Sequence, residues 1–212
     1  MAKYPAPGRV KTRLAASLGE DAAVALARAF VLDLAARLAT LPYEVVWAVD
    51  PADAPFAALV GGARCVPQRG ADLGARMARA VADELGAGAG AVLVLGADAP
   101  HVALPAIIDA AGALAAGADV VLGPAADGGY WLIGLAAALP ALFAGVAWGT
   151  ARVLAETEAR AAALGLSVRR VASTFDVDDV AGLARLADLV RRGAVELAHT
   201  RGVLETLTVL PT

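Results

Sequence analysis

Short apolar segments rich in β-branched residues alternate along this chain with longer segments of Ala, Leu and Arg that repeat with helical periodicity. The first pattern predicts strands, and the second predicts amphipathic helices. Parallel strands need a crossover between them, so the alternation favours an α/β fold with a mostly parallel central sheet flanked by helices. The strands are predicted within residues 44–49, 64–67, 91–95, 119–122, 130–134 and 168–171. The helices are predicted within residues 20–41, 72–85, 104–116, 150–164 and 180–192.

The composition supports one folded domain. The chain has 212 residues, of which 59% are hydrophobic and 5% aromatic, so Ala, Val and Leu supply the apolar mass. A chain of this length can bury a sizeable core. Short turns containing Gly, Pro or Asp separate the predicted elements, without a long linker, a repeat or a low-complexity tract. We therefore predict a single domain over residues 1–212.

The charges argue against nucleic acid as a partner. The formal net charge is −3, and the basic residues are scattered outside one N-terminal cluster, whereas nucleic-acid binders carry a broad basic face. The single Cys65 cannot form an internal disulfide, and its apolar flanks predict a buried structural thiol. No apolar core follows Met1, so we expect no signal peptide and a cytoplasmic protein.

One uncharged stretch, between Asp127 and Arg152, is nominally long enough to cross a bilayer. It contains several glycines and a proline, consists mainly of weakly hydrophobic Ala, and lacks a basic flank. We predict a strand, a turn and a short helix there, and no membrane span.

Ligands of open α/β sheets bind beyond the carboxyl ends of the strands, so loops at such places are the candidates for a site. The first candidate, residues 2–14, combines a loop shaped by Pro and Gly with four cations. Backbone N–H groups at a helix start and charge-assisted hydrogen bonds from Lys and Arg suit phosphate oxygens. The segment is no Walker loop, and a solvated basic terminus is the alternative. Its candidate residues are Lys3, Pro7, Gly8, Arg9, Lys11 and Arg13.

Two further candidates are carboxylates that could coordinate Mg²⁺ or Mn²⁺. Asp98 follows the apolar strand predicted within residues 91–95. A metal ion bound to its carboxylate could neutralise the charge of ligand phosphates. The alternative for Asp98 is to cap the helix within residues 104–116. Asp176 and Asp178 would point the same way in an extended segment and could share one cation. The alternative here is that Asp178 or Asp179 caps the next helix.

The fourth candidate joins the two strands predicted within residues 119–122 and 130–134. Its paired glycines allow close backbone approach, an aspartate can accept hydrogen bonds from sugar hydroxyls, and aromatic rings can pack on a sugar. A simple Asp-Gly hairpin contains the same residues and is the favoured alternative at this point. The residues concerned are Asp127, Gly128, Gly129, Tyr130 and Trp131. His101 has no neighbouring histidine, so a histidine metal cluster is not expected.

Taken in order, these segments resemble the DUF2064 family of glycosyltransferase-A-like transferases. The matching motifs extend over nearly the whole chain, in residues 2–14, 68–77, 96–100, 123–130, 148–150 and 176–178. The resemblance implies a Rossmann-like fold of the nucleotide-diphospho-sugar transferase kind, related to guanylyltransferases of cofactor synthesis. The family's first motif normally follows an apolar strand, whereas here it begins almost at Met1. We expect an upstream start, with a truncated first strand as the alternative.

Residue by residue, the resemblance implies a nucleotide site and a metal site. Lys3, Arg9, Lys11 and Arg13 would face the phosphates, and Gln68, Gly74 and Arg76 would lie near the nucleotide. Asp98 would be the principal metal ligand, supported by Asp176 and Asp178. The acceptor or sugar would meet Asp127, Tyr130 and Trp131. The segment from Gln68 also fits the start of an amphipathic helix with solvated surface residues.

The predicted activity is therefore a metal-dependent transfer from a nucleotide-activated donor to a small-molecule acceptor. Glycosyl transfer from a nucleotide sugar is the first hypothesis. The second is nucleotidyl transfer, guanylyltransferase-like, from a nucleoside triphosphate to a small phosphorylated acceptor. The third is a non-catalytic nucleotide-binding module. Pairings of Ser or Cys with His are absent, so direct attack by the acceptor is expected.

Overall fold

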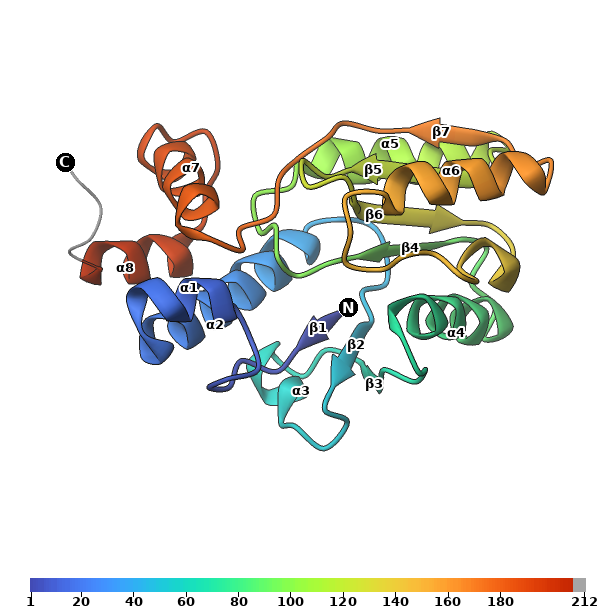
Figure 1. The fold of residues 1–212 in the computed structure, drawn as a ribbon. Helices are drawn as coiled ribbons and strands as arrows, with labels where there is room; N and C mark the ends of the chain where they lie inside the picture. The colour runs from blue at the N-terminus through green and yellow to red at the C-terminus, as the bar shows by residue number, and fades with distance from the viewer. Residues whose placement is uncertain (208–212) are drawn as a thin grey trace. The chain divides into compact units, whose positions relative to one another are not determined.

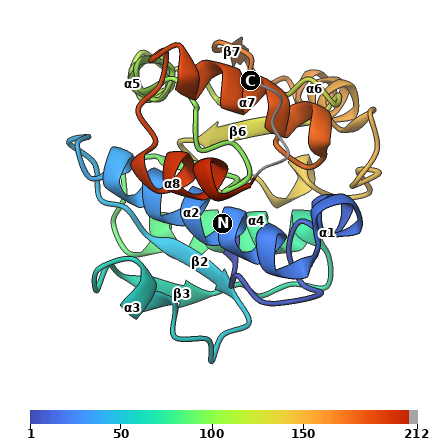
Figure 2. The ribbon, with the colours of Figure 1, turned by 90° about the vertical axis from the view of Figure 1, so that its left-hand side faces the viewer.

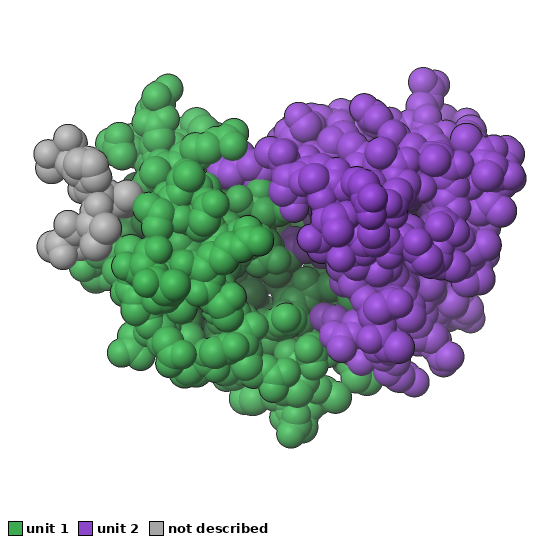
Figure 3. Space-filling view, in the orientation of Figure 1, with its two compact units in different colours: residues 1–67, 97–102, 176–212 green, residues 68–96, 103–175 purple. Residues whose placement is uncertain are grey.

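A computed structural model describes residues 1–207 of the chain. Strands and helices alternate along it (Figure 1), and this confirms the α/β class. Contacts group the residues into two units, coloured separately in Figure 3. Unit 1 holds residues 1–67, 97–102 and those from 176 onward, and unit 2 holds residues 68–96 and 103–175.

The sheet of unit 1 is parallel, with three strands in the order β1, β2, β3. The strands are β1 (Ala2–Lys3), β2 (Trp47–Asp50) and β3 (Cys65–Pro67). The two strands predicted within residues 44–49 and 64–67 are confirmed with later starts. The predicted set did not include β1, which pairs Lys3 with Asp50.

Five helices of unit 1 lie in the described residues: α1 (Thr12–Leu18), α2 (Glu20–Leu38), α3 (Phe56–Leu59), α7 (Val180–Arg191) and α8 (Ala198–Thr206). In α2 the buried residues recur three and four positions apart, the spacing of one helix face, at Ala23, Leu26, Ala27, Phe30, Val31 and Leu34. This helix contacts α1 and α8, and α8 in turn contacts α7 (Figure 2). The sequence predicted α2 and α7 but not α1, α3 or α8.

A buried carboxylate explains why α8 begins where it does. Asp33 of α2 is 2% exposed, and its two oxygens accept hydrogen bonds from the backbone N–H groups of His199 at 2.9 Å and Thr200 at 2.8 Å. The cap residue Leu197 supplies no side-chain hydrogen bond. A carboxylate at a helix N-terminus satisfies free N–H groups and favours the helix dipole, so α8 depends on a partner far away in sequence.

The sheet of unit 2 has four strands in the order β4, β6, β5, β7. They are β4 (Val92–Leu95), β5 (Val120–Pro124), β6 (Tyr130–Leu135) and β7 (Val168–Arg170), each inside or overlapping a predicted strand. This sheet is mixed, because β6 is antiparallel to both β4 and β5, while β5 and β7 are parallel. A tight turn between β5 and β6 leaves no room for a crossover, which accounts for the antiparallel pair.

The helices of unit 2 follow the predicted ranges. They are α4 (Leu73–Gly86), α5 (Leu104–Ala115) and α6 (Val153–Ala163), with the short 3₁₀ helix η1 (Pro140–Leu142). Asp72 caps α4 by accepting a hydrogen bond of 2.8 Å from the backbone N–H of Ala75. Among the helices of residues 1–207, none is long and apolar enough to cross a membrane.

Candidate active site

Lys11 lies at the centre of the candidate site. It precedes α1 and adopts a left-handed backbone conformation, with φ of 48°, which is uncommon and strained for any residue other than glycine. Its side chain is only 4% exposed, and the ammonium Nζ lies 5.5 Å from the centroid of the Phe30 ring. A residue with a left-handed backbone, directly before α1, thus carries a buried ammonium.

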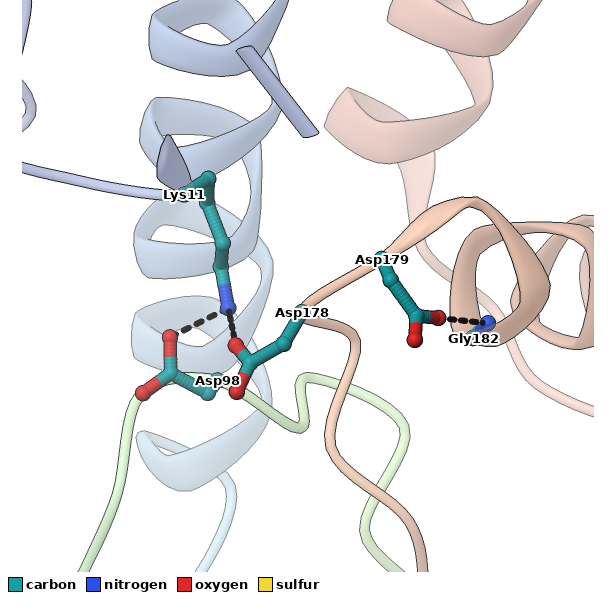
Figure 4. Close-up of polar contacts among 5 residues, drawn as sticks. All are labelled: Lys11, Asp98, Asp178, Asp179 and Gly182. Atoms are coloured by element: carbon teal, nitrogen blue, oxygen red, sulfur yellow. Dashed lines mark hydrogen bonds and ion pairs between the residues drawn. The ribbon is translucent and has the colours of Figure 1, made fainter. Parts of the chain in front are cut away.

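The Lys11 ammonium contacts two carboxylates that are remote in sequence (Figure 4). Nζ donates a hydrogen bond to Oδ1 of Asp98 and a second one, of 3.0 Å, to Oδ1 of Asp178. The side chains of Asp98 and Asp178 are 57% and 50% exposed. One buried cation is thus shared by two half-exposed carboxylates.

The charge of Lys11 is fixed by these neighbours. Burial acts to lower the pKa of Lys11, but the carboxylates of Asp98 and Asp178 outweigh it and hold that pKa above its usual value. Lys11 is therefore protonated at neutral pH.

The loop that carries Asp98 is held through its backbone. The Arg37 guanidinium of α2 donates hydrogen bonds to the carbonyl oxygens of Pro100 and, at 2.7 Å, of Val102. The N–H of Val177 donates to the carbonyl oxygen of Asp98 at 3.1 Å, which joins this loop to the segment of Asp178. The alternative that Asp98 caps α5 is not realised, because Ala103 is the cap residue and no side chain bonds there.

Two neighbouring aspartates take different roles at the start of α7. Asp179 is the cap, and its Oδ1 accepts a 2.8 Å hydrogen bond from the N–H of Gly182 (Figure 4). Asp178 is left to contact Lys11. The capping alternative is thus realised on Asp179, and a metal cation shared by Asp176 and Asp178 stays a prediction. Asp176 is half-buried, and its predicted role as a supporting metal ligand stays a prediction.

The residues present fit a divalent cation that arrives with phosphate. Within residues 1–207, no group of three or more His, Cys, Asp or Glu side chains could hold a metal. The side chains of Asp98 and Asp178 are half-exposed carboxylates that both contact the Lys11 ammonium. Mg²⁺ is commonly held by one or two carboxylates, with substrate phosphates and water completing its shell. Asp98 and Asp178 are therefore the candidate ligands.

The other N-terminal candidates are more exposed than Lys11. Lys3 and Arg13 are exposed on β1 and α1, and Gly8 has a φ of 68° in the intervening loop, with exposed Pro7 before it. Arg9 forms an ion pair of 3.7 Å with Asp50, at the end of β2. Sequence reasoning did not single out Asp50, although its place directly after a predicted strand was a usable signal.

In unit 2, residues 68–76 fold back on themselves. The Arg76 guanidinium donates hydrogen bonds to the carbonyl oxygen of Gly70 at 3.3 Å and to Oε1 of Gln68 at 3.4 Å. A Cβ on Gly74 would lie 2.6 Å from the Trp148 ring, so only glycine fits there. These contacts give Gln68, Gly74 and Arg76 local structural roles, and their nucleotide contacts stay a prediction.

The loop between β5 and β6 is a hairpin turn, as the favoured alternative stated. Oδ1 of Asp127 accepts a 2.8 Å hydrogen bond from the N–H of Gly129. Gly128 has a φ of 88°, and a Cβ there would lie 2.2 Å from the carbonyl oxygen of Ala151. The turn is thus held by the Asp127 side chain and by a glycine whose backbone conformation and close contact disfavour a larger residue.

The two aromatic residues after this turn face the interior of unit 2. Burial raises the pKa of Tyr130, so its hydroxyl is neutral, and its ring meets Trp148 edge-on at 6.4 Å. Trp131 is 4% exposed, and its Nε1 donates a 3.0 Å hydrogen bond to the carbonyl oxygen of Ala172. Trp131 is therefore part of the packed interior of unit 2. A sugar-binding role for either ring stays a prediction.

The side chains of Cys65 and His101 are both uncharged at neutral pH. Cys65 is half-buried rather than buried, and burial raises the pKa of its thiol, which disfavours the reactive thiolate. His101 is buried, and desolvation, with Arg37 and Arg185 nearby, lowers its pKa to about 4. Its imidazole is neutral at physiological pH.

Residues 31–150, more than half of the chain, match the family described as "Uncharacterized protein conserved in bacteria (DUF2064)". The chain belongs to the DUF2064 family. The resemblance seen in the sequence is thereby confirmed. A comparison of this DUF2064 protein with curated proteins finds no match.

The DUF2064 protein also resembles a solved structure from Desulfovibrio desulfuricans G20, which is assigned provisionally as a nucleotide-diphospho-sugar transferase. The TM-score is 0.90 at 33% sequence identity, and the likeness covers 97% of this chain and 91% of that one. The chain therefore has the fold of that structure. The family match contains Asp98 and Asp127 but neither Lys11 nor Asp178, so the Lys11 contacts add information that the match does not carry.

Proposed function

We propose that this protein is a transferase that uses a nucleotide-activated donor, with a divalent metal on Asp98 and Asp178 and the donor phosphates facing Lys11. The observation that carries the proposal is the buried Lys11 ammonium shared by two half-exposed carboxylates. Fixed charge of this kind suits phosphate groups that gain negative charge as they leave. The solved relative, assigned to nucleotide-diphospho-sugar transferases, supports the donor class.

Glycosyl transfer is the reaction we favour. The oxygen of the acceptor hydroxyl would bond to the anomeric carbon while the bond from that carbon to the diphosphate breaks, and the nucleoside diphosphate would leave with the electron pair. The proton of the acceptor hydroxyl would pass to solvent water. A bound Mg²⁺ or Mn²⁺ would neutralise part of the diphosphate charge. Lys11 would hold the leaving group, and the more exposed Arg9, Arg13 and Lys3 would attract it electrostatically.

The first experiment is a thermal-shift screen of nucleotide sugars, nucleoside diphosphates and nucleoside triphosphates, each with and without Mn²⁺. A ligand that binds the native state raises its apparent stability. We expect a metal-dependent shift in the wild type that is lost in Asp98→Ala. Asp53→Ala is the matched control, because Asp53 is an exposed aspartate of the same unit, and it should keep the shift.

Product analysis then identifies the reaction. Release of a nucleoside diphosphate from a nucleotide sugar supports glycosyl transfer, and release of pyrophosphate from a triphosphate replaces it with nucleotidyl transfer. A metal-dependent shift without turnover of any donor would leave a nucleotide-binding module. No shift with any nucleotide would refute the donor proposal itself.

A further inference from the structure

A divalent cation at this site would compete with Lys11 for the carboxylates of Asp98 and Asp178. Nζ bonds to one oxygen of Asp98 and one oxygen of Asp178, so the ammonium already serves as the cation that the two carboxylates share. The Lys11 side chain is also only 4% exposed, and its Nζ lies 5.5 Å from the centroid of the Phe30 ring. In the absence of other ligands, one of the two carboxylate charges is neutralised by the protein itself.

A metal ion added to this arrangement would meet an ammonium at close range. Repulsion between like charges a few ångströms apart is strong where solvent is partly excluded. An anion that pairs with the Lys11 ammonium in place of the carboxylates would offset this repulsion. Donor phosphates are such an anion, because they accept hydrogen bonds from lysine and also complete the shell of a divalent metal.

We propose that Lys11 acts as an internal counter-cation that keeps the Asp98–Asp178 pair from holding a divalent metal until donor phosphates arrive. This inference rests on the proposed function and adds a binding order to it. Metal and donor then favour each other's binding reciprocally, as coupling between two sites requires. The device would prevent metal from occupying the site without substrate.

The choice of lysine fits this role. Lys and Arg together number 18, and Lys3 and Lys11 are the only lysines, so arginine supplies the other 16 cations. An arginine would grip a carboxylate with a planar two-pronged fork, whereas lysine is a compact charge on a flexible stem that can change partners. At position 11 the chain also tolerates a left-handed backbone at a non-glycine residue.

The test titrates Mn²⁺ alone into wild type, Lys11→Met and Lys3→Met, and follows free Mn²⁺ by electron paramagnetic resonance. Methionine keeps an apolar stem near Phe30 without the charge. We expect Lys11→Met to bind Mn²⁺ about tenfold more tightly than wild type, within the usual range of coupling between sites. Lys3→Met removes the other lysine from an exposed position, and it should bind Mn²⁺ as wild type does.

If the proposal is correct, the higher Mn²⁺ affinity of Lys11→Met depends on the carboxylates of Asp98 and Asp178. Asp98→Asn added to Lys11→Met should therefore return Mn²⁺ affinity to the wild-type level. Lys11→Gln is the second variant, in case Lys11→Met loses its native circular dichroism spectrum. Equal Mn²⁺ affinity in wild type and a folded, neutral position-11 variant would overturn the proposal.

The two proposals fail separately. If the neutral variants show no gain, but wild type binds nucleotide only with Mn²⁺, the counter-cation role is wrong and the transferase site stands. If the gain appears and depends on Asp98, but no nucleotide binds to wild type, the counter-cation role stands and the donor proposal is wrong.

Discussion

Two regions with similar sequence signals turn out to use their aspartates differently. In unit 1, Asp98 and Asp178 are half-exposed and contact the ammonium of Lys11, which lies 87 and 167 positions away in sequence. In unit 2, Asp127 bonds to the backbone N–H of Gly129, two positions away. Both regions combine a strand end with glycine or proline and an acidic side chain.

The difference lies in what satisfies the carboxylate. A carboxylate that accepts a hydrogen bond from a nearby backbone N–H group stabilises a turn or a helix end, as Asp127 and Asp179 do. A half-exposed carboxylate that is paired with a buried ammonium lacks such a local backbone partner, and in the proposed binding order it becomes available to a metal once an anion pairs with the ammonium. The second arrangement is the one on which we base the proposed site.

The largest expected effect separates the two neighbours Asp178 and Asp179. Asp178→Asn removes a carboxylate from the Lys11 cluster, and we expect turnover of the donor to fall about 100-fold or more, the scale of a lost electrostatic contact in a site. Steady-state assay of product release at saturating Mn²⁺ measures it.

Asp179→Asn is the matched control, because it removes the same charge one residue later and asparagine caps helices equally well. It should retain turnover within about twofold. If both variants lose activity to the same extent, general charge at the start of α7 matters and the Lys11 cluster does not.

The next effect tests whether the hairpin of unit 2 is a structural element. Gly128→Ala places a Cβ 2.2 Å from the carbonyl oxygen of Ala151 at a φ of 88°, and we expect the free energy of unfolding to fall by roughly 2–3 kcal/mol. Gly149→Ala has a φ of 77° but nothing within 4 Å, so it should cost only about 1 kcal/mol. Urea denaturation of both variants measures the difference, and equal losses would mean that the close contact with Ala151 does not constrain the turn.

A third prediction concerns the support of Asp98. Arg37→Met removes the hydrogen bonds to the carbonyl oxygens of Pro100 and Val102, and we expect a loss of roughly 1.5–2 kcal/mol in unfolding free energy. The metal-dependent thermal shift with the donor should shrink as well, because the Asp98 loop loses its anchor. Arg28→Met, on the exposed face of the same helix, should change neither quantity. An unchanged shift in Arg37→Met would show that Asp98 is positioned without Arg37.

The smallest effect is expected at Asp127. Asp127→Ala removes the side-chain hydrogen bond to Gly129, and we expect a loss of about 0.5–1 kcal/mol in unfolding free energy. The metal-dependent shift with nucleotide should persist, in contrast to Asp98→Ala. Loss of that shift in Asp127→Ala would break the comparison between the two regions and place Asp127 among the donor-binding residues.

The sequence by itself determined the α/β class, the strands β2 to β7 and the helices α2, α4, α5, α6 and α7, because local periodicity and turn residues encode them. It also pointed to Lys11, Asp98 and Asp178 as separate candidates, Lys11 through its basic N-terminal loop and the two aspartates as carboxylates that come after predicted strands. The single-domain organisation, and the roles of Asp176 and of the candidates in unit 2, stay predictions.

Tertiary structure alone decided which of these candidates meet. The short strand β1 needs β2 beside it, and α8 needs the buried Asp33 at its first turn, so neither has a strong local signal. Likewise, nothing near Asp178 or Asp179 in sequence says which one caps the helix and which one contacts Lys11. That choice depends on where the folded chain places a buried ammonium, because a charge out of water must be paired.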